Sequence, residues 1–297
     1  MCGDTGAVVA VSYTAGRRPA LARAVLFLAS GETLWLGGPL GRAGGGARET
    51  LSVRERGAAQ YDLRLSARAT LLAGPARLAE GEGAGGPPVP VGLELTLEPA
   101  SQRLALGAGD VTLMRGDGSL SVGSVVHSVA GTAWSASGAD GGPGGLAGSR
   151  ARAVFQDGSA LYVAGASAVA GGGGPVAAIV LNTQIRATTV GDLVAEEAGQ
   201  GRAGRSVSWA AAGRAPAAAR GQIRDPRQQV TVAPAGTGHP NTGHPNTGHP
   251  NTGRPSWNYA PYVFVRSGVT GLGLVEWQQR ESAGPGTDPA DELPDPY

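Results

Sequence analysis

Short apolar runs dominate the chain, and several of them alternate with polar positions. In residues 61–71 (YDLRLSARATL), leucine or alanine takes every second position from 63 to 69, while Arg64, Ser66 and Arg68 take the positions between. Residues 91–97 (VGLELTL) alternate in the same way. A period of two is typical of a β-strand with one buried face. About a dozen short apolar runs, separated by turn-forming residues, predict an all-β fold, either a sandwich or a barrel.

Glycine-containing turns are expected between many of these strands. The segment 116–118 (GDG) stands between two apolar runs, and Asp157-Gly158 stands between two others. Such pairs suit tight turns that need a positive φ, so we expect a hairpin at each place. Helical patterns are scarce, and the best short helix candidate is residues 190–198 (VGDLVAEEA).

The length of 297 residues allows two β domains of ordinary size. A glycine-rich break at residues 138–148 predicts an N-terminal β domain over 1–140 and a C-terminal β domain over 141–282. Residues 283–297 are rich in proline and acidic side chains, which predicts a loose tail. Within the second domain, residues 234–255 contain a five-residue repeat (TGHPN) without apolar side chains beyond proline, so we expect a surface loop.

Composition excludes several classes of chemistry. The formal net charge is only +1, which argues against a nucleic-acid binder. Cys2 is the single cysteine, so an internal disulfide and a cysteine-cluster metal site are excluded. All 24 basic residues are arginine, so a Schiff-base lysine and a P-loop lysine are excluded too. We expect no membrane span and no signal peptide, hence a cytoplasmic protein.

Histidines are the first candidates for metal or ligand binding. His239, His244 and His249 recur through the repeat, and three imidazoles are a possible metal-ligand set. A repeat loop supplies no rigid second layer of contacts, so we expect no metal site there. His127 follows the apolar run 122–126 and is a candidate at a strand end or facing an interior, where a structural role is the alternative.

Trp134 is the strongest candidate for lining a pocket. One large ring stands beside small polar groups, among them Ser135, Ser137 and Asp140. An apolar pocket with a few directed hydrogen bonds has this composition. On a strand, Trp134 faces away from Ser135 and Ser137, so ring and hydroxyl share a pocket only if the strand bends near Ser135. The alternative is that Trp134 fills a core.

Several segments together resemble the carotenoid hydratase (hydroxyneurosporene synthase) superfamily, which includes lipocalin-like Diels–Alderases. The similar segments, in order, are 57–75, 104–134, 151–162 and 268–277. The motifs are a Gly-x-x-Trp strand end, a strand ending in an Asp-Gly turn and a closing Gly-x-Gly-x-x-Glu strand. They correspond to Gly131–Trp134, Phe155–Gly158 and Gly271–Glu276.

The resemblance implies two tandem lipocalin-like antiparallel barrels or sandwiches, an apolar pocket and no cofactor. Family members often carry an Asp-His-x-Trp-Gly stretch after the tryptophan, whereas residues 135–141 read SASGADG. Because only Asp140 remains as an acid, hydration of an alkene is less well supported than cyclisation. Cyclisation needs a folded substrate and one or two hydrogen bonds to a carbonyl. Ser135, Ser137 and Asp140 are the predicted catalytic residues. The predicted ligand-binding residues are Trp134, His127, Glu276 and Trp277.

Three functions are compatible with these residues. The first is a cofactor-independent cyclase or isomerase that folds an apolar polyene or polyketide in natural-product biosynthesis. The second is a non-catalytic carrier of a lipid or pigment, and the third is a hydratase-like lyase. A β-protein without a small-molecule ligand is the remaining alternative.

Overall fold

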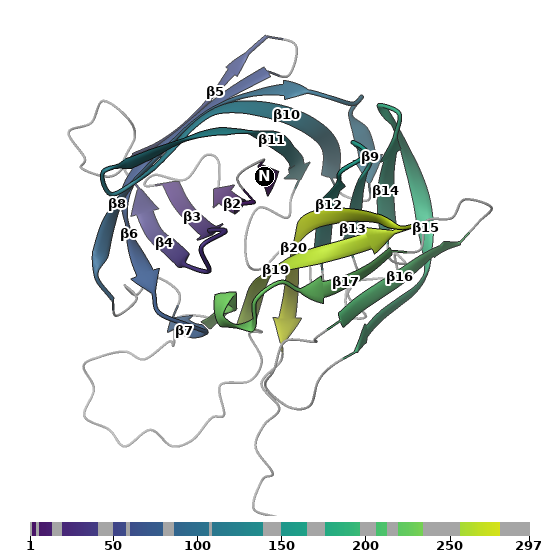
Figure 1. Ribbon diagram of the computed structural model, residues 1–297. Coiled ribbons are helices and arrows are strands. Elements are labelled where there is room, and N and C mark those ends of the chain that lie inside the picture. The colour runs from purple at the N-terminus through teal and green to yellow at the C-terminus, as the bar shows by residue number, and fades with distance from the viewer. Residues whose placement is uncertain are drawn as a thin grey trace, which may run out of the picture.

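The all-β prediction is confirmed by the computed structural model (Figure 1). It describes residues 2–3, 6–13, 20–40, 50–57, 60–79, 86–106, 109–138, 150–164, 176–196, 206–212, 219–233 and 256–279. Most of these residues lie in strands of two ten-stranded sheets. The repeat at 234–255 and the tail at 283–297, on which two predictions rest, lie outside the described residues.

The first sheet closes on itself. Its order is β11-β1-β2-β3-β4-β6-β8-β10, and β10 pairs again with β11, so the order returns to its start. β5 pairs with β6, and β9 with β10. Its strands are β1 (Cys2–Gly3), β2 (Val8–Tyr13), β3 (Ala20–Phe27), β4 (Thr33–Leu40), β5 (Thr50–Arg56), β6 (Gln60–Leu72), β8 (Pro88–Pro99), β9 (Leu104–Leu106), β10 (Gly109–Val122) and β11 (Val125–Gly138).

The second sheet closes in the same manner. Its order is β17-β16-β15-β14-β13-β12-β20-β19, and β17 pairs with β19. A 3-10 helix, η1 (Pro226–Gln228), precedes β18, which pairs with β19 and, in parallel, with β7. Its strands are β7 (Ala76–Ala79), β12 (Arg150–Phe155), β13 (Ala160–Ala164), β14 (Val176–Leu181), β15 (Gln184–Glu196), β16 (Ser206–Ala212), β17 (Ala219–Ile223), β18 (Val230–Ala233), β19 (Ser256–Arg266) and β20 (Val269–Gln279).

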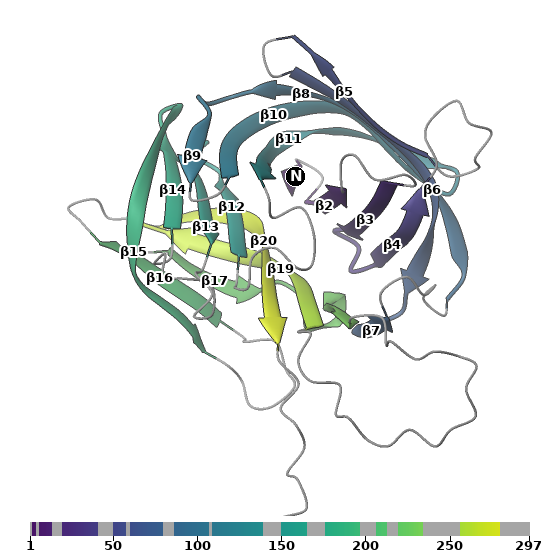
Figure 2. The same ribbon diagram turned by 180° about the vertical axis from the view of Figure 1, so that it is seen from behind.

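Each barrel has a core of its own, and a third apolar region joins the two. One cluster, which includes Leu26, Leu65 and Leu93, draws only on strands of the first sheet. Another, which includes Tyr262 and Phe264, draws only on the second sheet. The remaining clusters mix both sheets, so the outer faces of the barrels pack on each other (Figure 2). We call this region the junction.

Two local predictions are wrong. The segment 116–118 lies in the middle of β10, and the hairpin turn comes later, at Gly123, whose φ is 60°. Gly118 has a φ of 155°, and a Cβ there would lie 1.9 Å from the Glu94 carbonyl oxygen, so glycine permits close approach of β8. The helix expected at 190–198 is strand in β15 as far as Glu196, and this part of β15 pairs with β16. Sheet pairing has overridden local helix preference there.

The hairpin expected at Asp157-Gly158 is confirmed. Gly158 has a φ of 77°, and its amide donates to the Phe155 carbonyl at 3.0 Å, which closes the turn between β12 and β13. Within the part of the chain that the structure describes, no helix is long and apolar enough to cross a membrane.

Candidate functional site

The junction contains polar and charged side chains among its apolar ones, and these come mainly from the outer face of the second barrel. Three strands, β19, β20 and β12, place one residue each in a single row, because Glu276 is paired with Tyr259 on one side and with Arg150 on the other. The next row on β12 and β13 pairs Arg152 with Tyr162. Residues two apart on a strand share a face, so both rows face the first barrel.

An ion pair between Arg152 and Glu276 lies at the centre of this face. The guanidinium Nη1 is 3.1 Å from the carboxylate Oε2, and Glu276 is 8% exposed. Burial disfavours the charged guanidinium, but the Glu276 carboxylate, with Tyr162 and Tyr259, outweighs burial and raises the pKa of Arg152. Arg152 therefore stays charged although it is enclosed.

Tyr259 connects this pair to the first barrel. Its hydroxyl is hydrogen-bonded to the side chain of Arg23 on β3, and its ring lies 6.5 Å from the ring of Trp35 on β4. Burial and the Glu276 carboxylate raise the pKa of Tyr259 to about 12, against the opposing effects of Arg23 and Arg152. The phenol is therefore neutral at physiological pH. We call Arg23, Arg150, Arg152, Tyr259 and Glu276 the arginine cluster.

Some donors of the arginine cluster have no acceptor. Within the described residues, Nε and Nη2 of Arg150 and Nε of Arg152 are buried without a hydrogen-bond partner. Buried polar atoms in proteins are almost always satisfied, so each exception calls for an explanation such as a bound ligand or water. Both guanidinium groups lie close to aromatic faces, Arg150 5.7 Å from the Trp257 ring centre and Arg152 5.8 Å from that of Tyr162.

Trp134 also lies at the junction, next to this cluster. Its ring is 5.7 Å from that of Tyr162, and its indole N–H donates to the Ala153 carbonyl at 3.3 Å. Trp134 is half-buried and packs against apolar residues of both sheets. Through Tyr162 and Arg152, the structure therefore brings two predicted ligand-binding residues, Trp134 and Glu276, into one connected region.

The other predicted site residues lie elsewhere. β11 keeps an unbroken register with β10 to Gly138, so Ser135 stays on the face opposite Trp134 and the strand does not turn its hydroxyl toward the ring. Ser137 has its backbone in the same strand, and Asp140 lies outside the described residues. His127 is exposed near the hairpin end of β11. Trp277 faces the second barrel's own core, on the side of β20 opposite Glu276.

Arg150 and Arg152 could not be recognised as candidate site residues from the sequence. Arg150 and Arg152 alternate with buried Ala151 and Ala153, a pattern that on its own indicates a strand face open to water. Only the packing of one barrel on the other encloses that face. Tyr259 and Glu276 were visible in the sequence as polar residues within apolar strands. That they lie side by side follows only from the register of β19 and β20.

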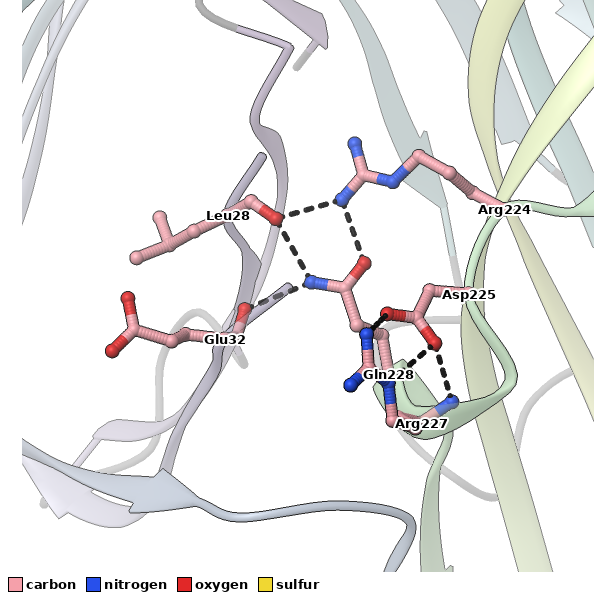
Figure 3. Close-up of polar contacts among 6 residues, drawn as sticks. All are labelled: Leu28, Glu32, Arg224, Asp225, Arg227 and Gln228. Carbon is pink, nitrogen blue, oxygen red and sulfur yellow. Dashed lines mark hydrogen bonds and ion pairs between the residues drawn. The ribbon is translucent and has the colours of Figure 1, made fainter. Parts of the chain in front are cut away.

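A second polar contact joins the barrels through η1 (Figure 3). The Arg224 guanidinium donates to the carbonyl oxygens of Gly6 and Leu28 and to Oε1 of Gln228. The Gln228 amide in turn donates to the carbonyls of Leu28 and Glu32, at 2.9 Å each. We call this set the η1 contact. Gln228 is 1% exposed, yet both ends of its amide are hydrogen-bonded.

No group of three or more histidine, cysteine, aspartate or glutamate side chains in the described ranges is arranged to hold a metal ion. The repeat histidines His239, His244 and His249 fall outside those ranges. The arginine cluster instead offers hydrogen-bond donors, positive charge and aromatic surfaces. Such a set can bind and polarise an oxygen atom of an otherwise apolar molecule.

Comparison with known proteins supports the fold and nothing narrower. No protein-family profile and no curated protein matches the chain. Among solved structures, the chain is similar to a protein of Nitrosomonas europaea that carries the AttH designation, with a TM-score of 0.52 and 15% identity. The match covers 93% of this chain and 88% of the other. At this identity the likeness shows a shared fold, and the resemblance to carotenoid hydratases stays a prediction.

Proposed function

We propose that the protein binds an apolar polyene or polyketide intermediate at the junction and promotes its cyclisation or isomerisation without a cofactor. The observation that carries this proposal is the set of buried guanidinium donors on Arg150 and Arg152 that have no acceptor among the described residues. Aromatic rings of Trp134, Tyr162 and Trp257 lie beside them. These rings suit a flat conjugated chain, and the donors suit an oxygen atom at its end.

The chemistry needs only the protein's own groups. In a cycloaddition, two carbon–carbon σ bonds form from the π electrons of a diene and an alkene, so no atom or electron enters or leaves. Holding both partners in reactive geometry supplies much of the rate enhancement. A guanidinium N–H that hydrogen-bonds a conjugated carbonyl draws electron density from the alkene and lowers the barrier further. Glu276 holds Arg152 in position through the ion pair.

The test is incubation of the protein with linear polyene and polyketide substrates, followed by absorbance and mass spectrometry. Cyclisation shortens the conjugated system, so absorbance should shift to shorter wavelength while the mass stays unchanged. A gain equal to one water molecule would instead identify a hydratase. A compound retained but unaltered would identify a carrier. The carrier is the second candidate, favoured by the placement of Ser135 on the face opposite Trp134.

The location is tested separately by tryptophan fluorescence. Ligand binding should quench Trp134 because its ring lies at the junction, so Trp134→Phe should reduce the ligand-dependent quenching. Trp277→Phe is the matched control, because that half-buried ring packs in the core of the second barrel. If both variants reduce quenching equally, or Trp277→Phe reduces it more, binding at the junction is wrong.

A further inference from the structure

We infer that the ligand of the junction carries a carboxylate and that Arg150 receives it, an inference that rests on the proposed function. Arg150 is the less satisfied of the two half-buried arginines on β12. Two of its guanidinium nitrogens, Nε and Nη2, are buried without a hydrogen-bond partner in the described part of the chain, against one nitrogen of Arg152. Nε and one Nη of a guanidinium form the edge that binds a carboxylate through two parallel hydrogen bonds.

The carboxylate of the arginine cluster belongs to Glu276, whose Oε2 forms an ion pair with the other arginine but has no hydrogen-bond partner in the described part of the chain. Glu276 lies directly across the ladder from Arg150, yet its ion pair is with Arg152, one row further along β12. Two guanidinium groups therefore share one carboxylate on this face. Because an arginine does not give up its proton in a protein, the imbalance cannot be relieved by neutralisation. A second carboxylate would balance the charge.

The side chain of Arg150 is also held in place before any ligand arrives. Its guanidinium carbon lies 5.7 Å from the centre of the Trp257 ring, within the range of a cation–π contact. A neutral carbonyl would accept hydrogen bonds but would leave the excess positive charge uncompensated. An enclosed charge is costly unless it is paired, so a carboxylate fits this position better than an ester or a ketone.

The experiment compares parinaric acid, a linear polyene carboxylic acid, with its methyl ester. Each is titrated at pH 7 into the wild-type protein and two variants, Arg150→Gln and Arg220→Gln. Arg220 is exposed on β17, so Arg220→Gln removes the same charge without touching the junction. Wild type should bind the acid about tenfold or more tightly than the ester, the scale of one charge-assisted contact. Arg150→Gln should abolish that preference, and Arg220→Gln should keep it.

The outcomes separate this inference from the proposed function. Equal wild-type affinities for acid and ester would overturn the carboxylate and leave binding of a polyene at the junction standing. A preference for the acid that survives in Arg150→Gln would overturn the role of Arg150. Binding of neither compound would count against both proposals. If Arg150→Gln does not fold, as judged by circular dichroism, the wild-type ratio of the two affinities still decides on the carboxylate.

Discussion

The barrels meet through two arginine-containing contacts that differ in how completely their hydrogen bonds are made. In the η1 contact, Arg224 and Gln228 reach three backbone carbonyls of the first barrel and also bond to each other (Figure 3). In the arginine cluster, Arg152 pairs with Glu276, but donors of Arg150 and Arg152 are buried without partners in the described ranges. Both contacts hold positive charge, but of the two only the arginine cluster contains buried side-chain donors without an acceptor in the described ranges.

This difference separates a structural contact from a candidate binding site. A fully satisfied polar network rigidifies the structure and fixes how two elements pack. An incompletely satisfied one costs stability, and natural proteins retain such costs mainly where function requires them. The η1 contact therefore sets the relative position of the barrels. The arginine cluster is the place where a ligand would complete the hydrogen bonding.

The largest expected effect comes from removing the only carboxylate of the arginine cluster. Glu276→Gln keeps the shape of the side chain but leaves the enclosed Arg152 without a counter-charge. Breaking a buried ion pair in this way costs about 3–5 kcal/mol of unfolding free energy. Urea denaturation followed by circular dichroism measures it. Glu94→Gln, exposed on β8, is the control and should change stability by less than about 0.5 kcal/mol. A Glu276→Gln protein as stable as the control would show that the cluster is not enclosed.

The η1 contact should respond to loss of its arginine. Arg224→Met removes hydrogen bonds to the carbonyls of Gly6 and Leu28 and to the Gln228 amide, at about 1 kcal/mol each, so we expect a loss of about 3 kcal/mol. The same urea titration measures it. Arg227→Met is the neighbouring control, since exposed Arg227 bonds only to Asp225 among the contacts of Figure 3. If Arg224→Met and Arg227→Met unfold at similar urea concentrations, the η1 contact does not have the structural role assigned to it.

The sequence predicted the strands better than the contacts between them. Alternation of period two located β6 and β8, because each has one face in the core of the first barrel. It could not tell that the face of β12 bearing Arg150 would be covered, since that depends on packing between distant segments. The role of a glycine was also ambiguous in the sequence, because it depends on whether another strand lies against it. Gly158 makes a turn, whereas Gly118 allows two strands to approach, and both have a positive φ.

The candidate site was predicted only in part. Trp134 and Glu276 were singled out as ligand-binding residues, and both lie at the junction. Ser135 was grouped with Trp134 on the assumption of a strand bend, but β11 continues without a break in register. Sequence neighbours on a strand lie on opposite faces, so the polar partners of Trp134 come from a different strand, where Arg152 lies over Tyr162.

Alkaline pH should lower stability through two tyrosines. Burial raises the pKa of Tyr262 to about 12, and burial together with Glu276 does the same for Tyr259. Between pH 10 and 12 the unfolded chain loses these protons while the folded protein keeps them. The stability that the two neutral phenols contribute is therefore fully present below pH 10 and is lost as the pH rises above it. Each tyrosine accounts for at most about 2–3 kcal/mol of that fall. In urea titrations across this range, Tyr259→Phe should show a smaller fall than wild type. An equal fall would mean that Tyr259 is open to water.

The smallest change in stability should come from Arg150, which has two buried nitrogens without a hydrogen-bond partner in the part of the chain that the structure describes. Arg150→Met keeps a long flexible side chain beside Trp257 and removes a half-buried charge. The lost contact with the ring is worth about 0.5–1 kcal/mol, and the desolvation cost that disappears is at least as large. We therefore expect unfolding free energy equal to that of wild type or higher by about 1 kcal/mol, in contrast to the loss expected for Arg224→Met.

Because the same change removes the donors proposed for the ligand, affinity for parinaric acid should fall while stability does not. Denaturation and titration of one preparation measure both quantities. A loss of more than about 2 kcal/mol, with affinity per folded molecule unchanged, would make Arg150 a structural residue like Arg224 and remove the distinction between the two contacts.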